Sequence, residues 1–109
     1  MLDEAQQAIV DGISASNPGW RLETVAHAAG FFVLRQPSPQ EYRMFTSQIL
    51  DPMQQALAYT NLLVATCVHP EKADVAKAVT SYPGLPSNKR IIGALNRLSG
   101  SEDAEQAKG

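Results

Sequence analysis

Residues 31–42 have the sequence Phe31-Phe32-Val33-Leu34-Arg35-Gln36-Pro37-Ser38-Pro39-Gln40-Glu41-Tyr42, which joins a β-strand to an α-helix with almost no loop between them. Proline lacks the backbone N–H that a strand ladder uses, so Pro37 ends the strand. Ser38 is a typical N-cap residue, Pro39 suits the first helical position, and Glu41 completes a capping box. The stretch therefore predicts a fold that combines β and α structure.

A β-hairpin is predicted just upstream of this joint. Two apolar-rich runs, residues 20–27 and 31–36, flank the short segment Ala28-Ala29-Gly30. Gly30 tolerates the positive φ angles that a short hairpin loop requires, so the two runs are expected to pair antiparallel. Because a lone two-stranded hairpin is marginal in water, one face should pack on helices and the other should meet a partner or a further strand.

The two faces of the hairpin follow from the alternation of side chains along a strand. Phe32 and Leu34 share one face, while Phe31, Val33 and Arg35 share the other. The second face also carries apolar groups, so the sequence predicts that it offers surface to a protein partner. The residues expected to face that partner are Trp20, Leu22, Phe31 and Val33.

Helices are predicted on both sides of the hairpin. Asp3 and Gln6 form a weak capping box for an N-terminal helix, and the charge-free run from Pro52 to Pro70 predicts a core helix. A further helix is expected from about residue 71 to 81, and a last one follows Ser87 as its cap. The predicted fold is α+β, with an N-terminal helix, a β-hairpin, and then a compact group of four helices packed on one face of the hairpin.

The chain has 109 residues, a length typical of one domain. The predicted domain spans residues 1–98, and residues 99–109 are expected to form a disordered acidic and polar tail. The predicted core consists of Ile9, Phe32, Leu34, Tyr42, Phe45, Leu57, Val64, Val79, Ile92 and Leu95.

Composition and charge limit the classes of function. The net charge of −2 gives no general attraction to nucleic acid or to an acidic membrane surface. The single cysteine excludes an intrachain disulfide, and the acidic first residues do not resemble a signal peptide, so a cytoplasmic protein is expected. The charge-free run contains glutamine, threonine and asparagine side chains, which are costly in hydrocarbon and argue against a membrane span.

Candidate chemistry is sparse. Cys67 and His69 suggest a metal site, but residues two apart on a helix do not face each other, and a structural zinc site usually needs four such ligands. A cysteine on an apolar stripe commonly acts as a small hydrophobic residue. Asp3, Glu41 and Asp51 are accounted for as helix-start residues. We therefore predict no catalytic residue, no metal site and no cofactor.

The positive charge is uneven and leaves an alternative open. Between residues 69 and 98 five lysines and arginines stand against two acidic residues, a local surplus of three. Two helices joined by a short turn would suggest a small DNA-binding regulator built on residues 71–98. Its predicted DNA contacts are Lys89, Arg90 and Arg97. An ordinary solvated helical surface is the favoured interpretation, since a DNA footprint is usually denser in charge.

From Phe32 onward the chain resembles the tail assembly chaperones of tailed bacteriophages and prophages. The residues that carry the resemblance are the strand leading into Arg35-Gln36-Pro37-Ser38-Pro39, then Glu41-Tyr42 and Phe45, Cys67-Val68-His69-Pro70, and Tyr82-Pro83-Gly84-Leu85. The resemblance implies a non-enzymatic role in virion morphogenesis in the cytoplasm of the bacterial host. It also implies protein–protein contacts with tape-measure or tail-tube proteins, and association with further copies of the chain is compatible with it.

Overall fold

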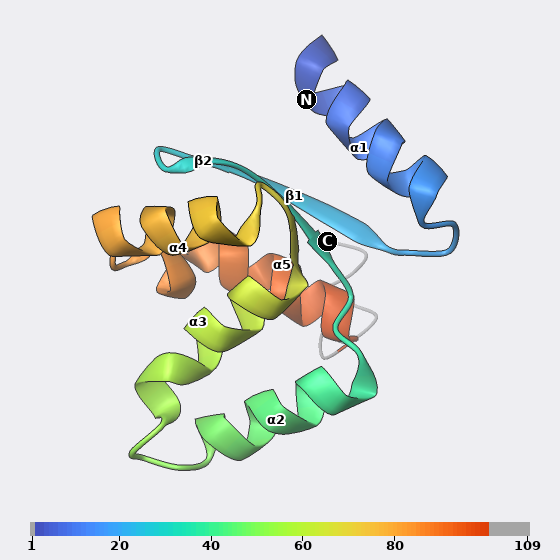
Figure 1. Ribbon diagram of the computed structural model, residues 1–109. Coiled ribbons are helices and arrows are strands. Elements are labelled where there is room, and N and C mark those ends of the chain that lie inside the picture. Colours follow the sequence, from blue (N-terminus) through green and yellow to red (C-terminus); the bar gives the residue numbers. More distant parts are fainter. Residues whose placement is uncertain (1, 101–109) are drawn as a thin grey trace.

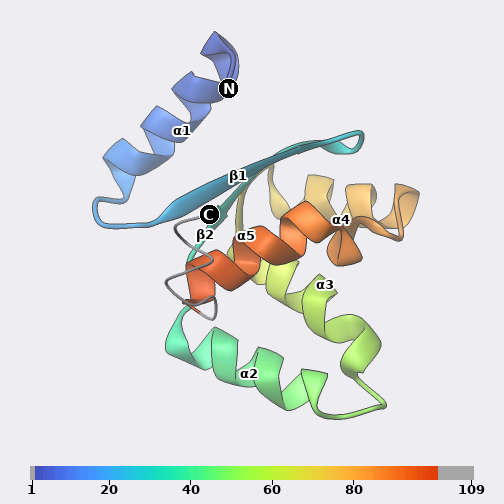
Figure 2. The ribbon, with the colours of Figure 1, turned by 180° about the vertical axis from the view of Figure 1, so that it is seen from behind.

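The computed structural model describes residues 2–100, which form an α+β fold with an N-terminal helix, a three-stranded antiparallel sheet and a group of helices (Figures 1 and 2). In chain order the elements are α1 (Glu4–Ser16), β1 (Leu22–His27), β2 (Gly30–Arg35), α2 (Pro39–Ile49), α3 (Gln55–Thr66), β3 (Cys67–His69), α4 (Lys72–Ser81), the 3₁₀ turn η1 (Leu85–Ser87) and α5 (Lys89–Ser99).

The predicted hairpin is confirmed. β1 and β2 pair antiparallel from Leu22 opposite Arg35 to His27 opposite Gly30, so Ala28 and Ala29 make a two-residue loop. Gly30 has a φ angle of 144°, which an L side chain would rarely adopt. The His27 Nδ1 atom accepts a hydrogen bond of 2.9 Å from the Ala29 N–H, which gives this imidazole a local role in the turn.

The third strand was not predicted. The expected long helix ends at Thr66, and Cys67–His69 turns back to pair antiparallel with β2. The residue before a proline disfavours helical backbone, so the His69–Pro70 step favours an extended segment here. β2 thus becomes the middle strand of the order β1-β2-β3, and the marginal two-stranded hairpin gains a further strand.

The helices α3, α4 and α5 cover one face of the sheet, and α2 packs against α3 farther from the strands (Figures 1 and 2). The core lies between them and the sheet. Phe32, Leu34 and Leu95 in this layer are completely buried, and Phe45 is buried beside them, as predicted. Tyr42, Val64 and Val79 pack at its margin. In α5 the fully buried position belongs to Ile91, while Ile92 is only half-buried.

Three residues of the predicted core are not in it: Ile92, noted above, and two others. Ile9 lies on α1, and none of the residues Glu4–Ser16 is buried. Leu57 is an exposed residue of α3. The apolar side of α1 does not reach the core, whereas in α3 the core takes Ala58, Leu62 and Leu63 and leaves Leu57 in solvent.

Local capping rules fix the helix ends. The predicted capping boxes of α1 (Asp3 with Gln6) and α2 (Ser38 with Glu41) are both present. The last helix is capped by Asn88 instead of Ser87, and the Asn88 Oδ1 atom accepts a hydrogen bond of 2.9 Å from the Arg90 N–H. α5 extends to Ser99 and ends at a left-handed Gly100, so the domain reaches slightly beyond residue 98. The remainder of the predicted tail lies outside the described residues.

Candidate partner-binding site

Arg35 connects the sheet to two helices. Its guanidinium donates two parallel hydrogen bonds of 2.9 Å to the carboxylate of Glu41 at the start of α2. It also donates to the backbone oxygens of Gln36, at 2.9 Å, and of Ala65 in the last turn of α3, at 2.8 Å. The arginine fork suits this paired geometry. One side chain therefore sets the end of α3 against the beginning of α2.

The two charged groups at this contact, Arg35 and Glu41, form an ion pair with each other. The hydrogen bonds from Arg35 lower the pKa of Glu41 from 4.5 to about 2, and the Ser38 cap contributes in the same direction. The Glu41 carboxylate in turn raises the pKa of Arg35. The ring of Trp20 lies 5.7 Å from the guanidinium carbon, within the range of a cation–π contact. Arg35 and Glu41 therefore have a structural role, and their ion pair leaves neither charge unpaired for a catalytic role.

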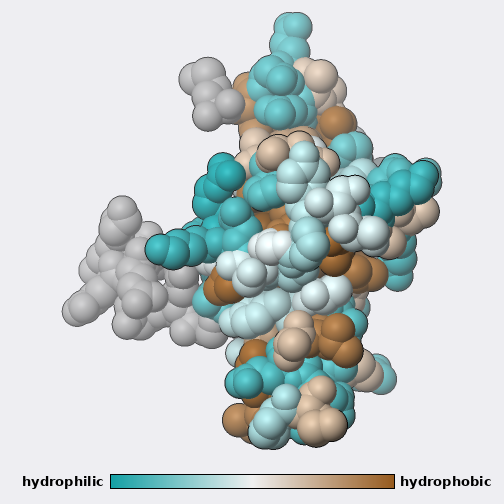
Figure 3. All heavy atoms as spheres, turned by 90° about the vertical axis from the view of Figure 1, so that its left-hand side faces the viewer, coloured by the Kyte–Doolittle hydropathy of each residue, from teal (hydrophilic) through white to brown (hydrophobic). Residues whose placement is uncertain are grey.

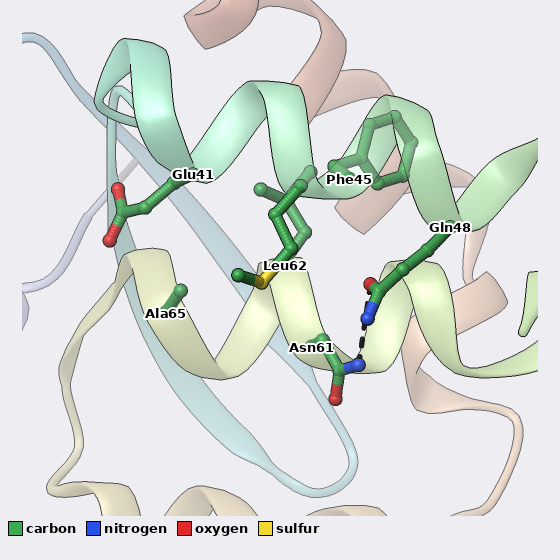
Figure 4. A pocket seen from close by; sticks show the side chains of 7 residues that line it. Glu41, Phe45, Gln48, Asn61, Leu62 and Ala65 are labelled. Carbon is green, nitrogen blue, oxygen red and sulfur yellow. Dashed lines mark hydrogen bonds between the residues drawn. The ribbon is translucent and has the colours of Figure 1, made fainter.

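An apolar groove opens between α2 and α3 beside this joint (Figure 4). It has a volume of about 50 Å³ and a lining that is almost entirely apolar at its surface. Asn61 Nδ2 donates a hydrogen bond of 3.3 Å to Gln48 Oε1 across the groove. The groove is lined by Glu41, Met44, Phe45 and Gln48 of α2 and by Asn61, Leu62 and Ala65 of α3.

Large apolar side chains are exposed around the groove and the turn that joins its two helices. Met44 is 58% exposed, Leu50 82%, Met53 89% and Leu57 56%. We call these four residues the α2–α3 surface. Figure 3 shows hydrophobic side chains at the lower end of the molecule, the end where Figure 1 places the turn between α2 and α3. Clustered exposed apolar residues are typical of interaction sites, whereas single ones are ordinary.

The turn before α3 explains why this surface is outside the core. The Asp51 Oδ1 atom accepts a hydrogen bond of 2.9 Å from the Met53 N–H, which holds a tight turn. α3 then begins at Gln55, without a side-chain cap. Its first three residues are exposed, Ala58 is already buried, and its second half supplies buried Leu62 and Leu63. This surface was not predicted, because α3 carries no charge at either end and so reads as a core helix.

The structure places the four predicted partner residues differently from one another. Trp20 is exposed, and Leu22 and Phe31 are half-buried on the sheet face opposite the core. Val33 is completely buried, so its prediction as a partner-facing residue is wrong. The reason is the third strand, which puts His69 beside Val33 on the side away from Thr24.

The three predicted DNA-contacting residues do not form one free group. Lys89 and Arg90 are exposed in the first turn of α5. Arg97 is in the last turn, where its Nη2 atom lies 2.8 Å from the Glu23 carboxylate of β1. Ile91 and Leu95 on the same helix are buried against the sheet side. α5 is thus primarily a core helix with two cations at its start.

Cys67 and His69, the two residues that suggested a metal site, have different surroundings. Burial raises the pKa of the Cys67 thiol to about 11, and the thiol donates to the His69 backbone oxygen at 3.1 Å. The His69 ring lies 6.2 Å from that of Phe31. Among residues 2–100, no three histidine, cysteine or carboxylate side chains gather into a group that would hold a metal ion. Over the same residues, no helix has the length and apolar character needed to cross a membrane.

Comparison with known proteins adds no relative: no protein-family model, curated protein or solved structure matches this chain.

Proposed function

We propose that this protein is a non-enzymatic assembly protein of the tailed-bacteriophage kind, a tail assembly chaperone that holds a tape-measure or tail-tube protein through its α2–α3 surface. The observation that carries the proposal is the gathering of Met44, Leu50, Met53 and Leu57 on one helical hairpin beside an apolar groove. The resemblance of the strand-to-helix joint to the chaperone family supplies the class of partner.

The physical properties of the surface suit a holding function. Burial of apolar area contributes about 25 cal/mol per Å², so four large exposed side chains provide a substantial driving force for association. Two of them are methionines, whose flexible side chains adapt to more than one partner shape. A groove between two helices is also the usual receptor for the apolar face of a third helix. Chaperoning needs this adaptable contact and no reactive group.

The sheet face remains a second surface for the same partner. Trp20, Leu22 and Phe31 keep part of their apolar area accessible there. The two surfaces lie on opposite sides of the sheet, so substitutions in one leave the other unchanged (Figure 1).

The test is co-expression with tape-measure and tail-tube proteins of a tailed bacteriophage, followed by measurement of the dissociation constant. Met53→Lys with Leu57→Glu should weaken binding by about tenfold or more, which corresponds to about 1.4 kcal/mol. Ala76→Glu, which adds charge to the exposed side of α4, is the matched control and should bind normally. Loss of binding with Trp20→Ala alone would assign the contact to the sheet face instead.

A separate measurement addresses the regulator alternative. The purified protein is titrated with duplex DNA at several salt concentrations, with Lys89→Ala and Arg90→Ala as variants. Phosphate contacts would give a steep loss of affinity with salt, and the two variants would reduce that slope. Such a result, together with no binding to either tail protein, would replace the chaperone proposal.

A further inference from the structure

The two edge strands of the sheet differ in how well they are protected. β3 has three residues, meets β2 with a register shift between Val33 and Leu34, and is followed at once by Pro70. Short strands, irregular pairing and prolines are devices that keep an edge strand from pairing with another chain. β1 has none of them, because its six residues, Leu22–His27, pair with β2 in unbroken register and include no proline, lysine or arginine. β1 is therefore the edge that can accept a further strand.

The backbone of β1 presents alternate residues to this edge. A two-residue loop is closed by hydrogen bonds between the residues that flank it, here His27 and Gly30. Bonded and non-bonded pairs alternate along an antiparallel ladder, so Leu22, Thr24 and Ala26 direct their N–H and C=O groups away from β2. Within the part of the chain that the structure describes, no backbone-to-backbone hydrogen bond joins β1 to an element other than β2. These three residues thus offer a row of donors and acceptors to another strand.

Helices lie over the two faces of β1 and leave the plane of the sheet for a partner strand. α5 packs against β1 on the core face, and α1 lies on the opposite face (Figures 1 and 2). Along the strand Ala26 is exposed, and Leu22 and Thr24 are half-buried. A strand that approaches in the plane of the sheet therefore meets the outward backbone groups of these residues.

A second copy of β1 fits this edge in one register. Antiparallel pairing with Thr24 opposite Thr24 of the second copy also places Leu22 opposite Ala26, so all the outward residues of both strands are bonded. Threonine pairs are among the favourable cross-strand pairs. A shift toward the start of the strand would put Glu23 opposite its own copy, where like charges repel. A shift toward the loop would put Leu22 opposite the loop residue Ala28 and lose part of the ladder.

The charges at the edge also allow two copies to meet. Glu23 is the only acidic residue of β1, and its carboxylate lies 2.8 Å from the guanidinium of Arg97 in the same chain. In the register centred on Thr24, Glu23 lies opposite Val25 of the second copy and not opposite a charge. A strand with one neutralised charge and an unprotected edge is complementary to itself.

We propose that this chain forms a symmetric dimer in which β1 pairs antiparallel with β1 of a second copy, with Thr24 on the two-fold axis. The two three-stranded sheets then become one sheet of six strands. The interface is isologous, because the same edge serves both copies, and it closes at two chains. This inference is independent of the proposed function. If that function also holds, the dimer presents two copies of the α2–α3 surface, and a partner that reaches both is held more tightly.

The first test locates the contact in the wild-type protein. Sedimentation over concentrations up to about 1 mM should show a dimer that dissociates on dilution. Hydrogen exchange should then show that the amides of Leu22, Thr24 and Ala26 exchange about tenfold or more slowly in the dimer than in the dilute monomer. The amides of Glu23 and Val25 already bond to β2, so they are the internal control and should be protected at both concentrations.

The second test places charges on the two-fold axis. Thr24→Lys and Thr24→Glu each bring like charges together and should weaken dimerisation by about tenfold or more. An equimolar mixture should form a 1:1 heterodimer that is about tenfold tighter than either variant with itself, and high salt should reduce this difference. Thr80→Lys makes the same change at an exposed position of α4 and should dimerise as the wild type does. The wild-type circular dichroism spectrum checks that each variant is folded.

Three results would overturn the proposal: a wild type that stays monomeric at every concentration reached, association that leaves the three outward amides unprotected, or a mixture no tighter than either variant alone. Association that is lost with Met53→Lys and Leu57→Glu but unchanged in Thr24→Lys would assign the contact to the α2–α3 surface and would also overturn it. Since no tail protein enters these assays, their failure is distinguishable from failure of the proposed function.

Discussion

The first three residues of α3, 55–57, are exposed and its last turn lies in the core, although the helix is made of uncharged, largely small and aliphatic residues throughout. Leu57 in the first turn is exposed, and Leu63 in the second half is completely buried. The difference comes from the neighbours. The end of α3 is held against the sheet by Arg35, whereas its beginning follows a turn that carries it away. Apolar composition therefore does not decide burial here; the neighbours of each position do, since Ala58, one residue after Leu57, is completely buried.

The largest expected effect separates these two leucines. Leu63→Ala should lower the free energy of unfolding by about 2–5 kcal/mol, because it removes a fully buried side chain and leaves a cavity. Leu57→Ala makes the same chemical change at an exposed position and should cost about 0.5 kcal/mol or less. Urea denaturation of both variants gives the comparison. Equal losses would mean that the two ends of α3 are buried alike.

The next largest effect is expected at Arg35, whose contacts with Glu41 and Ala65 hold the buried end of α3. Arg35→Lys removes the paired contact with Glu41 and the contact with the Ala65 oxygen, and should cost about 1–3 kcal/mol. Arg43→Lys on the exposed side of α2 is the matched control and should change stability by less than about 0.5 kcal/mol. A wild-type denaturation midpoint for Arg35→Lys would show that the joint does not position α3.

The same joint should produce a pH dependence with a definite sign. The pKa of Glu41 is lowered in the folded chain from 4.5 to about 2, so the folded state favours the charged form. Its contribution to stability is fully present above pH 4.5 and is lost as the pH falls from about 4.5 to about 2. Glu41→Gln should flatten the stability curve in that window. A variant curve that parallels the wild type would contradict the role of this carboxylate.

How much the sequence could predict also differs between the two regions. The joint was predictable because capping rules are local, and Ser38, Pro39 and Glu41 stand within four residues. The reach of Arg35 to Ala65 was not, because it spans 30 residues of chain. β3 escaped prediction because Cys67–His69 is too short to show an alternating pattern after an apolar helix.

The candidate site was the least predictable part. Strand alternation is a local property and puts Leu22 and Phe31 on the face opposite the core, where they are half-buried; their contact with a partner stays a prediction, as does that of Trp20. Val33 failed because its burial depends on a strand that comes 34 residues later in the chain. The α2–α3 surface was not predicted, because the composition of its helix indicates burial. An uncharged helix predicts a core element, and only the path of the chain at Asp51 shows that its first three residues lie outside the core.

The smallest expected effect is at the far end of the exposed region and sharpens the comparison further. Met53→Gln replaces a side chain that is almost fully in solvent, so the dilute protein should change stability by less than about 0.5 kcal/mol. If a bound tail protein covers Met53, however, the wild type gains stability from binding, and the variant gains less. The melting temperatures of the two proteins should therefore coincide without the tail protein and separate as its concentration rises. Coincidence at every concentration of the tail protein would mean that the exposed end of α3 stays uncovered in the complex.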